Sequence, residues 1–531
     1  MILDKDLLSI QEARNLTAKA REAQLEYKHF SQQQVDKIVK AMAEAGFQAS
    51  EKLAKMACEE SGFGVYEDKI IKNQFSTKNV FESIKNLKTV GIIAEEANGK
   101  VLKIAASMGV VCALIPSTNP TSTAMFKALI SLKSRNAVVA SPHPKTSKCT
   151  AEALRILTEA AENAGAPKGL IQCMSEPTIE GTEALMHDKN IAIILATGST
   201  PMVKSAYSSG KPAYGVGPGN VPAFIERTAN YQKAVADIIY GTTFDNGTLC
   251  SSEQSIIVDL PLKENVTEEA KAQGCYFVNA EEKEKLAKAI QTNLKINPEI
   301  VGKPATFIAN YAGFTVPENT RVLIAECQDV GKNEPLSIEK LSPVLSFYVV
   351  DGWLEGCHHC IDLLQFGGMG HSMVIHSNDE PIIMKFALEK PAFRILVNTP
   401  ASVGAVGYTT ALDPSMTLGP GTWGGSIISD NVTAKHLLNI KSLAFEINPI
   451  NKGKSVDKFE IQKYKGTKDW FIKEIEERLR ERAGNLPLKD VYTYSEIEKP
   501  IEKKSEPVKP ITYGSGITEE EIKKIIGEFS S

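Results

Sequence analysis

The sequence predicts an α/β protein with a parallel sheet in its first half and a second α/β domain after it. Short apolar segments of strand composition alternate with segments of helical pattern, which is typical of a parallel sheet. These segments are "GVVCALIP", "NAVVASP", "GLIQCM", "IAIILATG" and "AYGVGPGN". A weaker alternation runs from 255 to 400. The chain has 531 residues, which is enough for several domains and a large core.

The region before this sheet is predicted to be helical and to end in a hairpin. Residues 5–85 carry helical patterns, and Ser31 with Gln34 forms a capping box, the signature of a helix start. From residue 89 the composition changes to that of strands. Asn98-Gly99 marks a tight turn, so we expect a hairpin over 89–108.

We divide the folded part of the chain into three segments. Residues 1–243 are expected to form the helical N-terminus and the first α/β domain, with the hairpin as an arm near 89–108. Residues 244–400 are expected to form the second α/β domain, which starts at a loop that contains Cys250. Residues 401–445 are expected to return to the first domain.

The C-terminal part predicts a different organisation. Residues 446–485 are interpreted as a helical extension, and residues 486–516, rich in Pro, Lys, Glu and Ser, as a flexible linker. Residues 517–531 predict a short amphipathic helix, because an apolar residue recurs at helical spacing. Its apolar stripe is Ile522, Ile525, Ile526 and Phe529. A stripe on so short a helix needs a partner, either its own subunit or another protein.

Composition and charge exclude several classes of function. The chain has 60 Lys and Arg against 64 Asp and Glu, so it lacks the basic excess that is typical of nucleic-acid binding. No apolar run approaches the roughly 20 residues that a membrane span needs, and the N-terminus is charged rather than signal-like. An odd count of 9 cysteines in a large chain indicates reduced thiols and a cytoplasmic setting.

Four small, polar, glycine-rich loops can carry chemistry. They are "IPSTNPTSTAMFKAL", "LATGSTPMVKSA", "YGVGPGNVPAF" and "FDNGTLCSSEQ". Loops at the carboxyl ends of parallel strands form the ligand crevice of an open α/β sheet, and Gly-Ser-Thr at a helix N-terminus suits a phosphate. In the last loop Cys250 lies among small polar residues rather than in an apolar core, which favours a nucleophilic thiol over a structural one.

Six ordered blocks resemble the CoA-acylating branch of the aldehyde dehydrogenase superfamily over about residues 8–445. They are "TNPTSTAMFKALISLKSRNAVVASPHP", "ATGSTPMVKSAYSSGKPAYGVGPGNVP", "FDNGTLCSSEQS", "LSPVLSFY", "GGMGHS" and "TLGPGTWGG". This branch includes the aldehyde half of bifunctional aldehyde/alcohol dehydrogenases. The resemblance implies a Rossmann-type cofactor domain, an α/β catalytic domain and a β oligomerisation arm.

The resemblance implies a covalent route through Cys250. Its thiolate would attack the aldehyde carbon, hydride would leave to NAD+, and a thioester would remain on the enzyme. Asn119 and the Cys250 backbone N–H would stabilise the oxyanion. Hydrolytic relatives carry a glutamate in "LELGGKxP" that activates water. Here "GVGPGNVP", aligned on Pro222, places Val216 at that position. Since valine cannot act as a base, CoA is the expected acyl acceptor.

The resemblance also assigns the cofactor site. The residues expected to bind NAD are Pro142, His143, Gly198, Ser199, Thr200, Gly217 and Glu339. The Gly-Ser-Thr turn would face the pyrophosphate, and Glu339 would hold the nicotinamide ribose. His371 matches a histidine near the acyl-transfer site, and its alternative is a satisfied structural histidine.

Two further features concern metals and assembly. "GCHHC" at 356–360 is interpreted as a helix with one buried face rather than a metal site, since adjacent residues cannot all face one ion.

"KVLKIAASMG" and "VGYTTALDPSMTLGPGTWGG" match the oligomerising arm of the superfamily, so a homodimer or higher homo-oligomer is expected. The C-terminal helix resembles encapsulation peptides, which implies a bacterial microcompartment shell as partner.

The sequence leaves alternatives open for the substrate and for the class of protein. A small aldehyde, acetaldehyde or propionaldehyde, is favoured, with NAD preferred to NADP. A CoA-dependent succinate-semialdehyde or sulfoacetaldehyde dehydrogenase is the alternative and would need a cation for the distal anion of its substrate. More distant alternatives are a hydrolytic aldehyde dehydrogenase, an acyl-phosphate reductase and a non-catalytic scaffold on the same fold.

Overall fold

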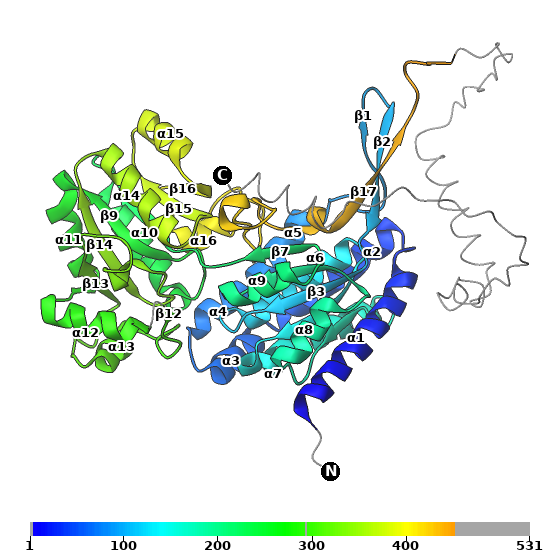
Figure 1. Cartoon of the computed structure of the whole chain (residues 1–531), viewed down its shortest axis with the longest axis horizontal. Coiled ribbons are helices and arrows are strands. Elements are labelled where there is room, and N and C mark those ends of the chain that lie inside the picture. The colour runs from blue at the N-terminus through cyan, green and yellow to red at the C-terminus, as the bar shows by residue number, and fades with distance from the viewer. Residues whose placement is uncertain (1–3, 293–294, 452–531) are drawn as a thin grey trace, which may run out of the picture. The chain divides into compact units, whose positions relative to one another are not determined.

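The computed structural model describes residues 4–292 and 295–451, which lie within one compact unit, Met1–Gln462 (Figure 1). The predicted helical extension from residue 452 onward, the linker and the C-terminal helix therefore lie outside the described residues. The fold is mixed α/β with two parallel sheets, as the sequence predicted.

The N-terminal region is helical. Its helices are α1 (Lys5–Tyr27), α2 (Gln32–Gln48), α3 (Ser50–Ser61), α4 (Tyr66–Gln74) and α5 (Val80–Ile84), with a π-helical turn η1 (Phe75–Asn79) between the last two. The predicted capping box is confirmed, because the Ser31 side chain accepts from the Gln34 N–H and the Gln34 side chain accepts from the Ser31 N–H. Helix α1 packs on α8 (Ile179–His187), and α2 packs on α7 (Ser147–Asn163).

A five-stranded parallel sheet forms the first domain. Its strands, in spatial order, are β5 (Ile171–Cys173), β4 (Ala137–Pro142), β3 (Val110–Ile115), β6 (Ile191–Thr197) and β7 (Ala213–Val216). Its helices are α6 (Pro120–Lys133), α7 (Ser147–Asn163), α8 (Ile179–His187) and α9 (Thr200–Ser208). Every residue of β3, β4 and α6 is buried, which explains their continuous apolar runs. Strand order reverses between β3 and β6, so a ligand crevice is expected at their carboxyl ends.

A seven-stranded sheet forms the second domain. Its strands, in spatial order, are β10 (Cys275–Phe277), β13 (Val322–Glu326), β14 (Val344–Val350), β9 (Glu253–Asp259), β8 (Val221–Ile225), β15 (Gly370–His376) and β16 (Ala392–Val397). Its helices are α10 (Tyr231–Thr243), α11 (Lys263–Ala272), α12 (Ala280–Ile290), α13 (Ala305–Ala312), α14 (Trp353–Phe366), α15 (Glu380–Glu389) and α16 (Ala401–Ala405). A short pair, β11 (Gln291–Thr292) and β12 (Lys295–Ile296), flanks the gap in the described residues.

The chain enters the second sheet earlier than we expected. Strand β8 pairs with β9 and β15, although it precedes residue 244, the predicted start of this domain. The boundary therefore follows β7, and a short segment, 217–220, joins the two sheets. The "YGVGPGNVPAF" stretch was interpreted as one strand and its loop, whereas it contains the end of β7, the connecting segment and β8.

A three-stranded antiparallel sheet forms an arm. Strand β1 (Gly91–Glu96) pairs with β2 (Val101–Ser107), which also pairs with β17 (Leu438–Ala444) near the end of the described chain (Figure 1). The predicted turn adopts left-handed backbone at Ala97, Asn98 and Gly99. In the described residues, no helix is both long and apolar enough to cross a membrane. All nine cysteines are free thiols.

Candidate active site

Most of the predicted cofactor residues, and the predicted catalytic residue Asn119, lie at one edge of the five-stranded sheet, whereas Glu339 lies just before β14 of the second sheet. Asn119 follows β3, His143 follows β4, the Gly198 turn follows β6 and Gly217 follows β7, and these four strands are neighbours in the sheet. All four strands are parallel, so their carboxyl ends lie on the same side. The sequence prediction that these loops share a crevice therefore agrees with the strand order.

The residues at this edge fit a dinucleotide. A methyl group added at Gly217 would meet nothing within 4 Å, and one at Gly198 would touch only Met202 at 4.0 Å, so a ligand can approach the backbone at both positions. The Ser199 side chain makes no capping hydrogen bond at the start of α9, and Ser199 and Thr200 are exposed. The first N–H groups of α9 can therefore meet a phosphate.

Cys250 lies in the loop that leads into β9, and it faces a histidine. Its Sγ lies 3.2 Å from His371 Nε2. A nucleophilic thiol and its general base are expected to make such a contact. Burial raises the pKa of the Cys250 thiol to about 12; the Glu339 carboxylate raises it further, and the Arg394 guanidinium opposes the rise. The resting thiol is therefore protonated at neutral pH.

His371 is held as a neutral imidazole in one orientation. It is fully buried in β15, and burial, with help from the Arg394 cation, lowers its pKa well below the usual value. Its Nδ1 lies 3.0 Å from Ser372 Oγ, which also accepts from Arg394 Nε at 3.1 Å. A neutral imidazole with one nitrogen on the thiol can take the thiol proton during attack.

The connecting segment 217–220 touches both the thiol loop and Glu339. Gly219 packs so closely on the Cys250 carbonyl that an added Cβ would lie 1.8 Å from its oxygen, so only glycine fits there. The Gly219 N–H donates to Glu339 Oε1 at 2.8 Å. Burial raises the pKa of Glu339 to about 7, although the N–H bonds oppose the rise. Just before this segment, Val216 is buried and ends β7.

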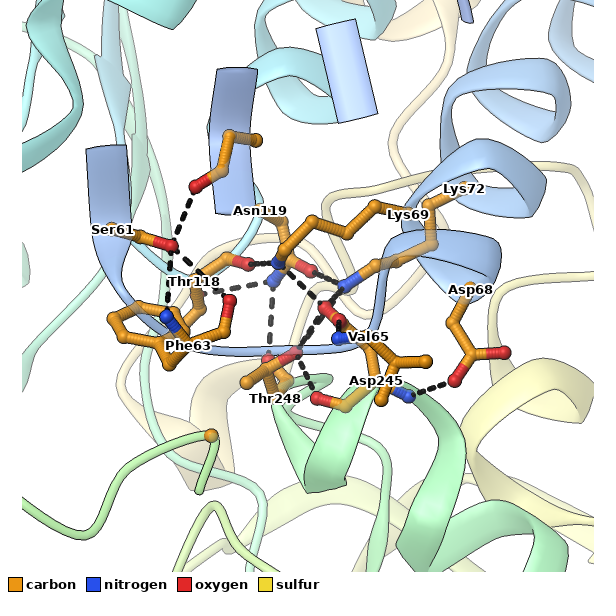
Figure 2. Close-up of polar contacts among 12 residues, drawn as sticks. Ser61, Phe63, Val65, Asp68, Lys69, Lys72, Thr118, Asn119, Asp245 and Thr248 are labelled. Atoms are coloured by element: carbon orange, nitrogen blue, oxygen red, sulfur yellow. Dashed lines mark hydrogen bonds and ion pairs between the residues drawn. The ribbon is translucent and has the colours of Figure 1, made fainter. Parts of the chain in front are cut away.

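Asn119 is bound from two sides (Figure 2). Its Nδ2 donates to the Thr248 carbonyl at 3.2 Å and to Thr118 Oγ1 at 3.1 Å, and its Oδ1 accepts from Lys72 Nζ at 2.6 Å. Because Thr248 stands two residues before Cys250, this bond ties the end of β3 to the thiol loop. The structure thus connects the two residues that the sequence named as catalytic.

A buried ion cluster behind Asn119 was not predicted. Asp245 is fully buried and pairs with Lys69 and Lys72, which stand three residues apart on one face of α4 (Figure 2). The sequence features that could have indicated this cluster are the "FDNG" stretch and the two lysines at helical spacing. They did not predict it, because exposed lysines are far more common than buried ones. Asp245 and Asn246 have left-handed backbone, with φ of 49° and 52°, which turns the Asp245 carboxylate back toward α4.

The "GCHHC" stretch lies on helix α14 and splits its side chains between core and solvent. Cys357 and Cys360 are buried, while His358 is exposed and His359 packs on Tyr348 with ring centroids 4.2 Å apart. Within residues 4–292 and 295–451, no group of three or more His, Cys, Asp or Glu is arranged to hold a metal.

The fold is a two-domain α/β protein with a thiol–imidazole pair in the second domain, and the Asn119–Thr248 hydrogen bond ties the loop of this thiol to the carboxyl edge of the first sheet. Residues 6–300 match the family model described as "Aldehyde dehydrogenase family". The bifunctional aldehyde-alcohol dehydrogenase AdhE of Escherichia coli K12 is 44% identical over 441 residues, 82% of this chain. The chain belongs to the aldehyde dehydrogenase family. It spans about half the length (50%) of this curated relative.

Solved structures agree with this assignment. An acetylating aldehyde dehydrogenase from Geobacillus thermoglucosidasius is 51% identical and aligns over 85% of this chain and 100% of its own, with a TM-score of 0.83. A propionaldehyde dehydrogenase of Rhodopseudomonas palustris, solved with bound CoA and an acylated cysteine, is 26% identical over 82% of this chain and 97% of its own, with a TM-score of 0.73.

Proposed function

We propose that this protein is a CoA-acylating aldehyde dehydrogenase that oxidises a small aldehyde with NAD+ to an acyl-CoA. The observation that carries the proposal is the 3.2 Å contact between Cys250 Sγ and His371 Nε2, beside an edge that fits a dinucleotide. The similarity to acetylating and propionaldehyde dehydrogenases supports the reaction class. NAD+ supplies the hydride acceptor when it is bound.

The chain's own groups perform the carbonyl chemistry. As the thiol attacks the aldehyde carbon, its proton passes to His371 Nε2, so the thiolate forms only at the moment of attack. Asn119 Nδ2, by exchanging its bond to Thr118 Oγ1, and the Cys250 N–H stabilise the developing oxyanion. After hydride loss the acyl group is a thioester on Cys250. Before CoA reacts, the His371 imidazolium releases to solvent the proton that it took from Cys250. His371 then takes the proton of the CoA thiol as its sulfur attacks the thioester, and it returns that proton to the Cys250 thiolate that leaves as acyl-CoA forms.

Val216 supports CoA rather than water as the acyl acceptor. A valine at the end of β7 offers no base where hydrolytic relatives carry glutamate. Glu339, whose pKa burial raises to about 7, accepts from the Gly219 N–H, and we assign it to the cofactor ribose rather than to water activation. The acyl-enzyme therefore survives in water until a thiol reaches it.

The cations near the site favour an uncharged aldehyde. Lys69 and Lys72 are held by Asp245, and Arg394 donates to Ser372, Gly419, Ser429 and Asn431. The distal anion of succinate semialdehyde or sulfoacetaldehyde would have to displace one of these partners. Acetaldehyde or propionaldehyde needs no such partner.

The test is acyl-CoA formation by the purified protein. We expect NADH to appear with propionaldehyde or acetaldehyde only when CoA is present, and little free acid. Val216→Ala is the matched control and should keep this product ratio. Free acid formed at a rate comparable to acyl-CoA would contradict the proposal. A higher kcat/KM for succinate semialdehyde would move the proposal to the alternative substrate, and no turnover with any aldehyde would favour a non-catalytic scaffold.

A further inference from the structure

Lys72 makes three hydrogen bonds, which use every donor of its ammonium group. Its Nζ donates to Asn119 Oδ1 at 2.6 Å, to Thr248 Oγ1 at 3.2 Å and to Asp245 Oδ2 (Figure 2). The side chain is only 4% exposed. An ammonium group has three donors and no acceptor. Lys72 is therefore fully committed to the protein and has no hydrogen left for a substrate.

The partners of Asn119 fix which end of its amide faces the thiol loop. An amide can place either its oxygen or its nitrogen on one side, and the hydrogen-bonding partners decide between them. Lys72 can only donate, so it holds the oxygen, while the Thr248 carbonyl can only accept, so it holds the nitrogen. Loss of Lys72 would leave the oxygen without its charged partner, and only the bonds of the nitrogen to the Thr248 carbonyl and Thr118 Oγ1 would still orient the amide.

We propose that Lys72 is a positioning residue that holds the Asn119 amide with its nitrogen toward the thiol loop, where the N–H now donated to Thr118 Oγ1 passes to the oxyanion formed on the Cys250 adduct. The inference rests on the proposed role of Asn119 as an oxyanion donor. Such donors work because they are aligned before the charge develops. Lys72 acts through Asn119 and touches neither substrate nor cofactor.

The cluster places a cation on the oxygen end of the Asn119 amide. Asp245 and Asp68 offset the two lysine charges, so the charge that acts on Asn119 is the local one on Lys72 Nζ, 2.6 Å from the amide oxygen. Burial lowers the pKa of Lys72 to about 8, and Asp245 opposes the fall, so Lys72 remains charged at neutral pH. Asp68 and Cys58 also face the cluster, and burial raises the pKa of both.

Lys69 provides a matched control within the same cluster. It pairs with the same Asp245 oxygen, at 2.9 Å, and it is 3% exposed. Its other polar contact is with the Thr118 carbonyl at 3.4 Å, and it lies over the Phe63 ring. Lys69→Met and Lys72→Met each remove one buried charge from Asp245, but only the second removes the contact with Asn119.

The experiment measures acylation of Cys250 by p-nitrophenyl acetate, which needs neither NAD+ nor CoA. Attack by the thiol forms a tetrahedral oxyanion, p-nitrophenol leaves, and an acetyl thioester remains on Cys250. We expect Asn119→Ala to slow the burst by about 10²-fold, as for loss of one oxyanion donor. Lys72→Met should slow it by roughly ten- to a hundred-fold, and Lys69→Met by less than about threefold. The apparent affinity for the ester should not change.

A double-mutant cycle decides whether Lys72 acts through Asn119. In the Asn119→Ala background, Lys72→Met should slow acylation by less than about threefold further, because the group that it positions is gone. Equal slowing by Lys72→Met with and without Asn119 would overturn the proposal. So would equal effects of Lys69→Met and Lys72→Met, or no effect of Asn119→Ala alone.

Two further results keep the test independent of folding and of the proposed function. Lys72→Gln retains a donor for Asn119 Oδ1, so it should recover more activity than Lys72→Met at equal thermal stability. If Lys72→Met does not fold, a Lys72→Gln variant as slow as Asn119→Ala overturns the proposal. A wild type that is acetylated by the ester but does not reduce NAD+ would reject the dehydrogenase function while the Lys72 cycle still gives its answer.

Discussion

Cys250 and His371 are both uncharged at rest, and this state follows from the same burial. Removal from water raises the pKa of the thiol to about 12 and lowers the pKa of the imidazole. An ion pair between them would place two charges where little water reaches them, and the Arg394 cation would oppose a charged imidazole. The neutral pair avoids this cost, so the proton transfer is coupled to attack on a substrate.

Replacing Cys250 tests the covalent route directly. We expect Cys250→Ala to abolish CoA-dependent NAD+ reduction while NAD+ binding persists, because loss of a covalent nucleophile costs several powers of ten. The readouts are NADH absorbance for turnover and fluorescence quenching for cofactor binding. Cys360→Ala, a buried thiol on α14, serves as the control and should keep turnover. Residual activity of Cys250→Ala above about 1% would rule out the covalent route.

The raised thiol pKa predicts the pH dependence of alkylation. Because only the thiolate reacts, the rate of Cys250 modification by iodoacetamide should climb about tenfold per pH unit from pH 7 to pH 10, with no plateau. The rate rises with pH over this whole range because the pKa of the Cys250 thiol is raised to about 12, above that of an ordinary thiol. Mass spectrometry of the Cys250 peptide gives the rate. A plateau below about pH 8 would mean that the thiolate forms at rest.

The sequence predicted the residues that carry a local signal and missed those that depend on folding. Cys250 stands out because its neighbours are small and polar, and Val216 because a motif position lost its acid. The contact of His371 with the thiol and the burial of Lys72 depend on how distant segments pack. A lysine in a helix is usually exposed, so nothing local marks Lys72 as buried.

At the scale of elements, predictions were best where turn and cap chemistry is local. The Ser31 capping box and the Asn98-Gly99 hairpin are both present. The start of the second sheet was placed too late, because β7 and β8 are separated only by the 217–220 segment, and glycine and proline in that segment look like one continuous loop. Strand partners are set by the whole sheet, which local patterns do not specify.

The C-terminal helix predicted over 517–531 can be tested as a separate element. Its stripe of Ile522, Ile525, Ile526 and Phe529 predicts docking on a partner. Residues 486–531 fused to a fluorescent protein should form foci in cells that assemble microcompartment shells. Ile525→Glu should disperse them, and Lys524→Glu, on the polar face, should not. A diffuse signal for the unmodified fusion would reject the encapsulation role.

At the scale of the whole molecule, the arm predicts self-association. Strands β1 and β17 form the two edges of the arm sheet, and β17 is exposed along almost its whole length. Ile440 and Leu443 on β17 are 47% and 44% exposed, which is unusual for large apolar side chains on a strand edge. A second copy of the chain that pairs with these edges would cover them.

Light scattering measures the state of assembly. The mass at micromolar concentration should be that of a homodimer or a higher homo-oligomer. Ile440→Asp should lower the mass because a charge would be buried at the edge, whereas Asn439→Asp should not. A monomer mass for the unmodified chain would contradict the prediction.

The segment 217–220 connects the edge proposed for the cofactor with the loop of Cys250, so a change at one of these places can reach the other through it. Gly217 borders the cofactor edge, while Gly219 holds Glu339 and presses on the carbonyl of Cys250. A cofactor that shifts this segment on binding changes the equilibrium for acylating the thiol by some factor. Linkage then requires that acylation change the affinity for the cofactor by the same factor. The segment therefore predicts one coupling free energy between the two proposed binding equilibria, equal in both directions.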